Sequence, residues 1–139
     1  MIVLDTNVVS EVMKPKPDPA VISWLDAQET TDVFVCAVTV AEISFGLEIL
    51  PEGRRRDDLR RRFEGFVTGG FADRVLPLDQ AAARLYGTIM AHRKTLGRPM
   101  ALCDGQIAAS ARLHGMTLAT RNVRDFVHCG LEVVDPFGG

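Results

Sequence analysis

The chain has 139 residues, of which 47% are hydrophobic and 24% are charged, and its formal net charge is −2. These values are typical of a soluble globular domain, so we predict one domain over residues 1–139. No apolar run approaches the roughly 20 residues of a membrane helix, and the first residues lack the basic start of a secretory signal. Three widely spaced cysteines favour neither a disulfide framework nor a zinc site, which predicts a reducing, cytoplasmic setting. The small negative charge limits any nucleic-acid contact to local basic patches.

Short apolar runs alternate with helical stretches along the chain. In chain order, we predict a strand at 2–4, helices at 6–13 and 19–27, a strand at 33–36, helices at 39–50 and 51–67, a strand at 75–78, helices at 79–96 and 101–114, a strand at 117–119, a helical turn at 122–126 and a strand at 131–134. Local signals mark several helix ends, namely Asp18 before Pro19, Asp79 as a cap, and Gly115 as a stop.

This alternation predicts an α/β fold, a three-layer sandwich in which helices cover both faces of a central, mostly parallel sheet. In such sheets, ligands bind outside the carboxyl ends of the strands. Polar residues that follow predicted strands are therefore the first candidates for a functional site.

Two acidic residues follow the first two predicted strands. Asp5 comes directly after the strand at 2–4, and Glu42 lies in the first predicted helical turn beyond the strand at 33–36. Each also has a purely structural interpretation. Asp5 is a favoured helix N-cap, and Thr39 followed three residues later by Glu42 has the spacing of a capping box. For Asp5 the two roles can coexist, with one carboxylate oxygen for each.

Asp104 and Asp125 complete the acidic set. Asp104 opens the helix at 101–114 beside apolar residues at i+3, i+4 and i+7, so its carboxylate is expected near the inward face, where an unpartnered charge is costly. Asp125 follows the strand at 117–119. Two structural alternatives stay open, a solvent-facing Asp104 that complements the helix dipole and a helix start formed by Asn122 with Asp125.

Together, the four acids predict a metal site. Carboxylates gathered at one edge of a sheet raise one another's pKa, and a divalent cation relieves their repulsion. Oxygen ligands without His or Cys favour Mg²⁺ or Mn²⁺ over Zn²⁺. Such ions activate water and neutralise charge on phosphate, which is chemistry suited to cleaving a phosphodiester.

Several other kinds of site lose support because their motifs are absent. The chain has no GxGxxG loop after its first strand, no P-loop and no GxSxG motif. Its three histidines are scattered near predicted helix ends and loops, where they are expected at the surface or as caps. A nucleotide cofactor and a Ser-His or Cys-His nucleophile are therefore not predicted.

Four stretches of the chain resemble the motifs of PIN-domain proteins, most closely the VapC-like toxins of bacterial toxin–antitoxin pairs. They are, in chain order, Ile2-Val-Leu-Asp5-Thr-Asn, Thr39-Val-Ala-Glu42-Ile, Asp104-Gly-Gln-Ile-Ala-Ala and Leu118-Ala-Thr-Arg-Asn-Val-Arg-Asp125-Phe. The stretches follow the family's order and span nearly the whole chain. The last one resembles the subgroup that contains the FitB-type proteins.

The resemblance implies an α/β sandwich with a parallel sheet and a ribonuclease that depends on Mg²⁺ or Mn²⁺. The carboxylates that would carry catalysis and hold the metal are Asp5, Glu42, Asp104 and Asp125. Thr6 and Thr120 match polar residues of the family's site. The resemblance also implies a small cognate antitoxin chain, an RNA substrate, contact with operator DNA only through the antitoxin, and a homodimer.

Basic and apolar residues suggest further surfaces. Arg121 and Arg124 flank Asp125 and are candidates for holding a substrate phosphate beside the metal. Six arginines between residues 54 and 62 form either a solvated helix face with local ion pairs or a surface for phosphate or an acidic partner segment. Apolar residues of the first and third predicted helices either line an exposed antitoxin groove or pack in the core, and these are Val8, Val9, Val12, Phe45 and Leu47.

The function that we predict is a metal-dependent RNA endonuclease acting as the toxin of a toxin–antitoxin pair. A non-enzymatic alternative is a co-repressor subunit whose partner binds DNA, with the acidic groove as a docking or vestigial site. A third alternative is a metal-dependent phosphatase, although the chain lacks an Asp-x-Asp pair after its first strand.

Overall fold

A five-stranded parallel sheet forms the centre of the computed structural model, which describes residues 1–138. The strands are β1 (Ile2–Leu4), β2 (Val33–Cys36), β3 (Val75–Leu76), β4 (Thr117–Ala119) and β5 (Val133–Val134). Their order is β3-β2-β1-β4-β5, and each neighbouring pair is parallel. In the central register, Leu4 pairs with Val35 on one side and Ala119 on the other. The predicted parallel sheet is therefore confirmed.

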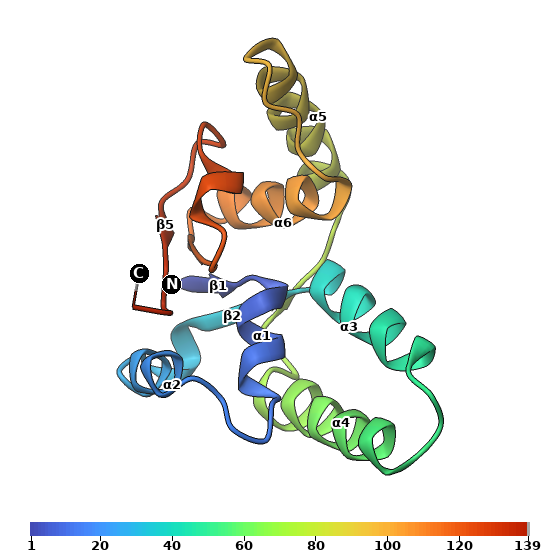
Figure 1. Cartoon of the computed structure of the whole chain (residues 1–139). Coiled ribbons are helices and arrows are strands. Elements are labelled where there is room, and N and C mark those ends of the chain that lie inside the picture. The colour runs from blue at the N-terminus through green and yellow to red at the C-terminus, as the bar shows by residue number, and fades with distance from the viewer. Residues whose placement is uncertain (139) are drawn as a thin grey trace.

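Helices cover both faces of this sheet (Figure 1). One face carries α1 (Thr6–Val12), α2 (Pro19–Asp26), α3 (Ala37–Ile49) and α4 (Arg54–Glu64), and the other carries α5 (Gln80–Thr95) and α6 (Leu102–Leu113). Three short helical segments complete the chain, η1 (Thr30–Asp32), the π-helical η2 (Gly65–Gly70) and η3 (Val123–Phe126). The predicted three-layer sandwich is confirmed. Among residues 1–138, no helix is both long and apolar enough to span a membrane.

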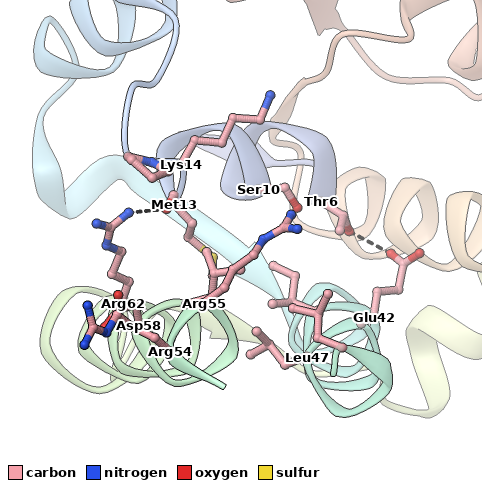
Figure 2. A pocket seen from close by; sticks show the side chains of 15 residues that line it. Thr6, Ser10, Met13, Lys14, Glu42, Leu47, Arg54, Arg55, Asp58 and Arg62 are labelled. Atoms are coloured by element: carbon pink, nitrogen blue, oxygen red, sulfur yellow. Dashed lines mark hydrogen bonds between the residues drawn. The ribbon is translucent and has the colours of Figure 1, made fainter. Parts of the chain in front are cut away.

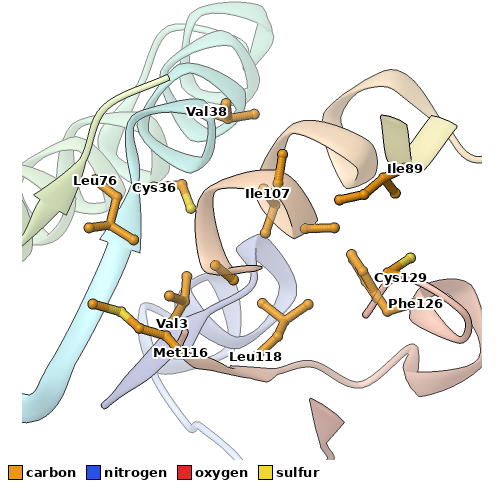
Figure 3. Close-up of a cluster of buried hydrophobic side chains, with 13 residues drawn as sticks. Val3, Cys36, Val38, Leu76, Ile89, Ile107, Met116, Leu118, Phe126 and Cys129 are labelled. Atoms are coloured by element: carbon orange, nitrogen blue, oxygen red, sulfur yellow. The ribbon is translucent and has the colours of Figure 1, made fainter. Parts of the chain in front are cut away.

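Two hydrophobic cores hold the layers together, because successive strand side chains point to opposite faces. Val3 and Leu118 pack with Ile107 of α6 and Ile89 of α5 in the first core, which Figure 3 shows. Leu4 faces the other way, into the second core with residues of α1 to α4. The sheet is therefore buried on both faces, as continuous apolar runs of parallel strands require.

Glycine permits the close approach of α5 and α6. A Cβ atom on Gly105 would lie 2.5 Å from the sulfur of Met90 and 2.9 Å from the ring of Tyr86. Because Gly105 directly follows Asp104, this tight packing fixes the start of α6 against α5. The first turn of α6 is thus held firmly where it carries its acidic residue.

Local sequence signals correctly place several helix ends. The side chain of Asp18 accepts a hydrogen bond from the Ala20 amide, and that of Asp79 accepts one from the Ala82 amide. Gly115 follows α6 with a φ of +64°, the left-handed conformation of a helix stop.

Other boundaries differ from the prediction. Helix α3 begins at Ala37 rather than Thr39, so Thr39 lies inside the helix and the predicted capping box is wrong. The arginine-rich helix begins at Arg54 instead of residue 51 and passes into the π-helical η2 at Gly65. Stacked Phe66 and Phe71 rings, 4.5 Å apart between centroids, pack across that end. The later start of α4 follows Gly53, whose φ of +151° lies far from helical values.

Candidate metal centre

Four acidic side chains lie beyond the carboxyl ends of neighbouring strands. Asp5 follows β1 directly, and Glu42 lies in the second turn of α3, which begins where β2 ends. Asp125 lies in η3, after β4, while Asp104 lies in the first turn of α6. Since β2, β1 and β4 are adjacent and parallel, their carboxyl ends meet at one edge of the sheet. The fold therefore brings to one edge acids that are up to 120 positions apart in sequence.

Asp5 is buried, with 4% of its surface exposed, and both of its oxygens are engaged. Oδ1 accepts a hydrogen bond from the Thr6 amide at 2.8 Å, which makes Asp5 the N-cap of α1. Oδ2 accepts from the Thr120 hydroxyl at 2.8 Å and from the Asn7 side-chain amide at 3.2 Å. The capping interpretation is thus confirmed, and it coexists with a position in the acidic site.

Asn7 has a positioning role that the sequence did not reveal. Its amide nitrogen donates to Asp5 and to the Thr120 hydroxyl, and its Oδ1 accepts from the backbone amide of Arg121 at 3.2 Å. It therefore ties the first turn of α1 to the loop after β4. The only sequence signal was its place in the first motif, which does not distinguish a structural role from a catalytic one.

Thr6 links the acidic site to α3. Its hydroxyl donates to Oε1 of Glu42 at 2.7 Å (Figure 2). The same hydroxyl lies 3.1 Å from the hydroxyl of Thr39. Thr39 is almost fully buried, and its hydroxyl takes part in this contact rather than in helix capping. The hydroxyl of Thr6 thereby orients the Glu42 carboxylate.

The acidic side chains act on one another electrostatically. Burial raises the pKa of Asp5, the charges of Glu42 and Asp125 raise it further, and hydrogen bonds from Thr120 and Thr6 oppose the rise. Burial together with the charges of the three other carboxylates raises the pKa of Asp104 to about 6, and the positive charge of Arg93 opposes this shift. The four carboxylates therefore form one coupled anionic group, and neutralising it would be favourable.

The donor chemistry of this group fits a hard divalent cation. Carboxylate and hydroxyl oxygens are the ligands that Mg²⁺ and Mn²⁺ prefer. Within residues 1–138, no three His, Cys, Asp or Glu side chains lie close enough together to enclose a metal ion as they stand. An ion such as Mg²⁺ keeps several waters and needs only one or two carboxylates, so an open arrangement is compatible with it.

Arg121 and Arg124 lie on the same loop as Asp125 but differ in their surroundings. The guanidinium of Arg121 lies over the Phe137 ring, 3.9 Å from its centroid, and 3.8 Å from Oε1 of the buried Glu11. Arg124 is exposed and forms no ion pair with any residue in 1–138. Arg124 is therefore the less restrained of the two predicted phosphate contacts.

A groove of about 680 Å³ opens beside Thr6 and Glu42 and runs between α1, α3 and α4 (Figure 2). Met13 and Leu47 are among its apolar lining residues. Its charged lining is mainly basic, with Lys14, Arg54, Arg55 and Arg62 against the two acids Glu42 and Asp58. Three of the residues predicted to line an apolar groove pack in the core instead, because Val8 and Val9 are buried and Val12 packs beside them. Phe45 is exposed and lies outside the lining of this groove.

Part of the arginine-rich helix forms local ion pairs. Arg56 and Arg60 both contact Glu48 of α3, and Arg61 contacts Asp58. These pairs match the solvated-face interpretation of α4. Arg54, Arg55 and Arg62 instead line the groove, and their contact with a phosphate or a partner segment stays a prediction.

The fold and this site define an α/β/α protein with a coupled acidic group at the carboxyl edge of a parallel sheet. Residues 2–129 match the family model described as "PIN domain". The chain belongs to the PIN-domain family.

Two relatives cover nearly the whole chain. VapC ribonuclease Y4jK of Sinorhizobium fredii is 47% identical over 137 residues, which are 99% of this chain and 98% of the relative. Toxin FitB of Neisseria gonorrhoeae is 40% identical and covers 99% of each chain. A solved structure of FitAB bound to a DNA fragment superposes with a TM-score of 0.92 at 40% identity, covering 100% of this chain and 97% of the other. These comparisons confirm the resemblance to VapC-like toxins of the FitB type.

Proposed function

We propose that this protein is a ribonuclease that acts as the toxin of a toxin–antitoxin pair and uses Mg²⁺ or Mn²⁺. The acidic group at the sheet edge carries this proposal, because the buried Asp5 and the half-buried Asp104 lie near the charges of the other two carboxylates, and a divalent cation would relieve that repulsion. The names of the relatives support it, since they include a ribonuclease and a toxin. An endonuclease acting within RNA chains is the specific form that we favour.

Asp5, Glu42, Asp104 and Asp125 would hold the cation or orient the attacking water. Such a cation, when bound, supplies Lewis-acid stabilisation of charge on a phosphodiester and activates water. Thr120 and the Thr6 amide keep the Asp5 carboxylate in a fixed orientation, while the Thr6 hydroxyl does the same for Glu42. Because these hydrogen bonds exist before substrate arrives, the oxygens need little reorganisation when the cation binds.

The exposed arginine of the site loop would contact the substrate. Arg124 is free to approach a phosphate near Asp125, whereas Arg121 would first have to leave Phe137 and Glu11. Thr6 and Thr120 are held within the site by their hydrogen bonds and would contribute through the carboxylates they contact. We expect the protein to act in the cytoplasm, as a homodimer.

The partner that we propose is a small antitoxin chain. The groove beside Glu42 is lined by apolar residues and by the basic residues Lys14, Arg54, Arg55 and Arg62, which suits an amphipathic segment that carries acidic side chains. The solved FitAB complex was bound to DNA, so we expect operator DNA to be contacted through the antitoxin. This partner would cover the groove that adjoins the acidic site.

The test is RNA cleavage by the purified chain with Mg²⁺ or Mn²⁺, with and without a chelator. We expect wild-type cleavage to need the metal and to be lost in both Asp5→Asn and Glu42→Gln. The exposed Asp26→Asn on α2 is a matched charge control and should cleave as wild type does. Cleavage that is equal with metal and with chelator, or equal in wild type and both site variants, would remove the metal mechanism.

A co-repressor without catalysis is the second candidate, and the DNA-bound FitAB structure is the observation that favours it. On this alternative, the chain would bind operator DNA only together with its antitoxin, and the acidic site would not turn over RNA. Operator binding by the pair, without metal-dependent cleavage by the free chain, would support it. Clear turnover by the free chain would show that repression is not its whole function.

A further inference from the structure

Arg93, in the last turn of α5, is a buried cation without a carboxylate partner among residues 1–138. Only 5% of its surface is exposed. Its Nε donates to the Arg98 carbonyl at 2.7 Å, and Nη1 donates to the carbonyls of Asp125 and Val127, both at 2.8 Å. The sulfur of Cys129 lies 3.5 Å from the same nitrogen. Backbone and sulfur acceptors thus replace the water that the guanidinium loses on burial.

Most of these contacts are made to the segment that carries Asp125. Helix η3 has no side-chain cap, and the side chain of Asp125 itself is exposed. The main chain on either side of Phe126 is nevertheless held by one planar guanidinium, whose fixed donors suit two carbonyls at once. A lysine in this place would keep the charge but not this geometry.

We propose that Arg93 is a positioning residue of the candidate metal centre, holding Asp125 in place through the main-chain carbonyls of Asp125 and Val127 and so strengthening divalent-cation binding. This inference rests on the proposed function. Within the described residues 1–138, Arg93 forms no ion pair with a carboxylate, and it would not touch the cation. Its effect passes through the backbone of η3, in the way that outer partners orient the ligands of metal sites.

Whether removing Arg93 weakens or tightens cation binding distinguishes a positioning role from an effect of its charge. Arg93 is positive and lies near enough to influence Asp104, so its charge alone repels an incoming cation. Removing only that charge would therefore tighten cation binding. Weaker binding after removal of Arg93 can arise only from the loss of positioning or from damage to the fold, and a control variant separates those two.

The experiment compares Arg93→Met and Arg93→Lys with Arg112→Met in the full chain. Arg112 donates to the carbonyl of Cys129 at 3.3 Å and so supports the same loop away from Asp125. Mn²⁺ affinity is measured by titration calorimetry. Hydrogen exchange of residues 121–130 is measured without metal, and thermal unfolding shows whether each variant folds.

We expect Arg93→Met to bind Mn²⁺ about tenfold more weakly or worse, the effect typical of losing an outer partner of a metal ligand. Without metal, hydrogen exchange of residues 121–130 should be faster in Arg93→Met than in wild type. Arg93→Lys should lie between these two in Mn²⁺ affinity and in exchange, and Arg112→Met should bind Mn²⁺ nearly as wild type does. Unchanged or tighter binding by a folded Arg93→Met would overturn the proposal, as would equal weakening by Arg112→Met. If the wild type itself binds no Mn²⁺, the proposed function fails, whereas an effect missing only in the Arg93 variants refutes this inference alone.

Discussion

Replacing Asp104 with asparagine is expected to stabilise the metal-free protein near neutral pH and to weaken its response to divalent cations. Burial and the charges of Asp5, Asp125 and Glu42 raise the pKa of Asp104 from 3.8 to about 6. Above that pH, the folded chain carries a charge that its surroundings disfavour. Asparagine removes this charge with little change in side-chain volume, so the free energy of unfolding should rise.

The size of the effect follows from the shift in pKa. Each pKa unit corresponds to about 1.4 kcal/mol, so the whole shift of Asp104 would correspond to roughly 3 kcal/mol in the free energy of unfolding. The side chain is only partly buried, and solvent screening reduces this to about 1.5 kcal/mol. Asn also loses the favourable interaction of a carboxylate with the start of α6, about 0.5 kcal/mol. A net gain of about 1 kcal/mol should raise the Tm by roughly 3–5 °C.

The pH dependence fixes the sign of the prediction. Below the unfolded pKa of 3.8, Asp104 is protonated in both folded and unfolded chains and the stability linked to its raised pKa is fully present. That stability is lost as the pH rises through about 6, because the unfolded chain ionises more easily. Asp104→Asn should therefore have a higher free energy of unfolding than wild type near neutral pH and no such advantage at about pH 4.

Thermal unfolding followed by circular dichroism, with a chelator and with excess Mn²⁺, measures these differences. Asp57→Asn is the matched control, since Asp57 is an exposed acid in the first turn of α4. Mn²⁺ should raise the Tm of wild type and of Asp57→Asn, but much less that of Asp104→Asn. A chelated Asp104→Asn that melts below wild type near neutral pH, or that responds fully to Mn²⁺, would refute the reasoning.

Three further predictions concern the support of the site. Thr120→Val should cost about 1–3 kcal/mol by denaturant unfolding and raise the pKa of Asp5 further, because a buried carboxylate oxygen loses its hydroxyl donor, and Thr120→Ser should restore both. Gly105→Ala should destabilise by about 1–3 kcal/mol through collision with α5, whereas Gly87→Ala, with open space around it, should stabilise by up to about 1 kcal/mol in the same thermal assay. Phe126→Ala should cost about 3–5 kcal/mol in urea unfolding, since Phe126 is 1% exposed and packs η3 into the first core, and a loss below about 1 kcal/mol would contradict that packing.

The sequence predicted most of the secondary structure because its signals are local. A proline at the start of α2, the Asp79 cap and the Gly115 stop each act over a few residues, so they can be found without knowing the fold. The alternation of apolar runs with helices predicted the parallel sheet for the same reason. Local spacing failed at Thr39, where packing against Thr6 replaced the capping that the spacing predicted.

The sequence by itself also determined which acids were candidates and that oxygen ligands suit a hard cation. The tertiary structure alone decided how these residues are supported. The order β3-β2-β1-β4-β5 places the ends of β2 and β4 beside that of β1. This order could not be predicted from local sequence patterns. Arg93 lies between His92 and Lys94 in what the sequence presents as an ordinary basic helix end. Its burial against the Asp125 loop depends on contacts 32 and 34 residues away, and such contacts exist only once the sheet and its helices have assembled.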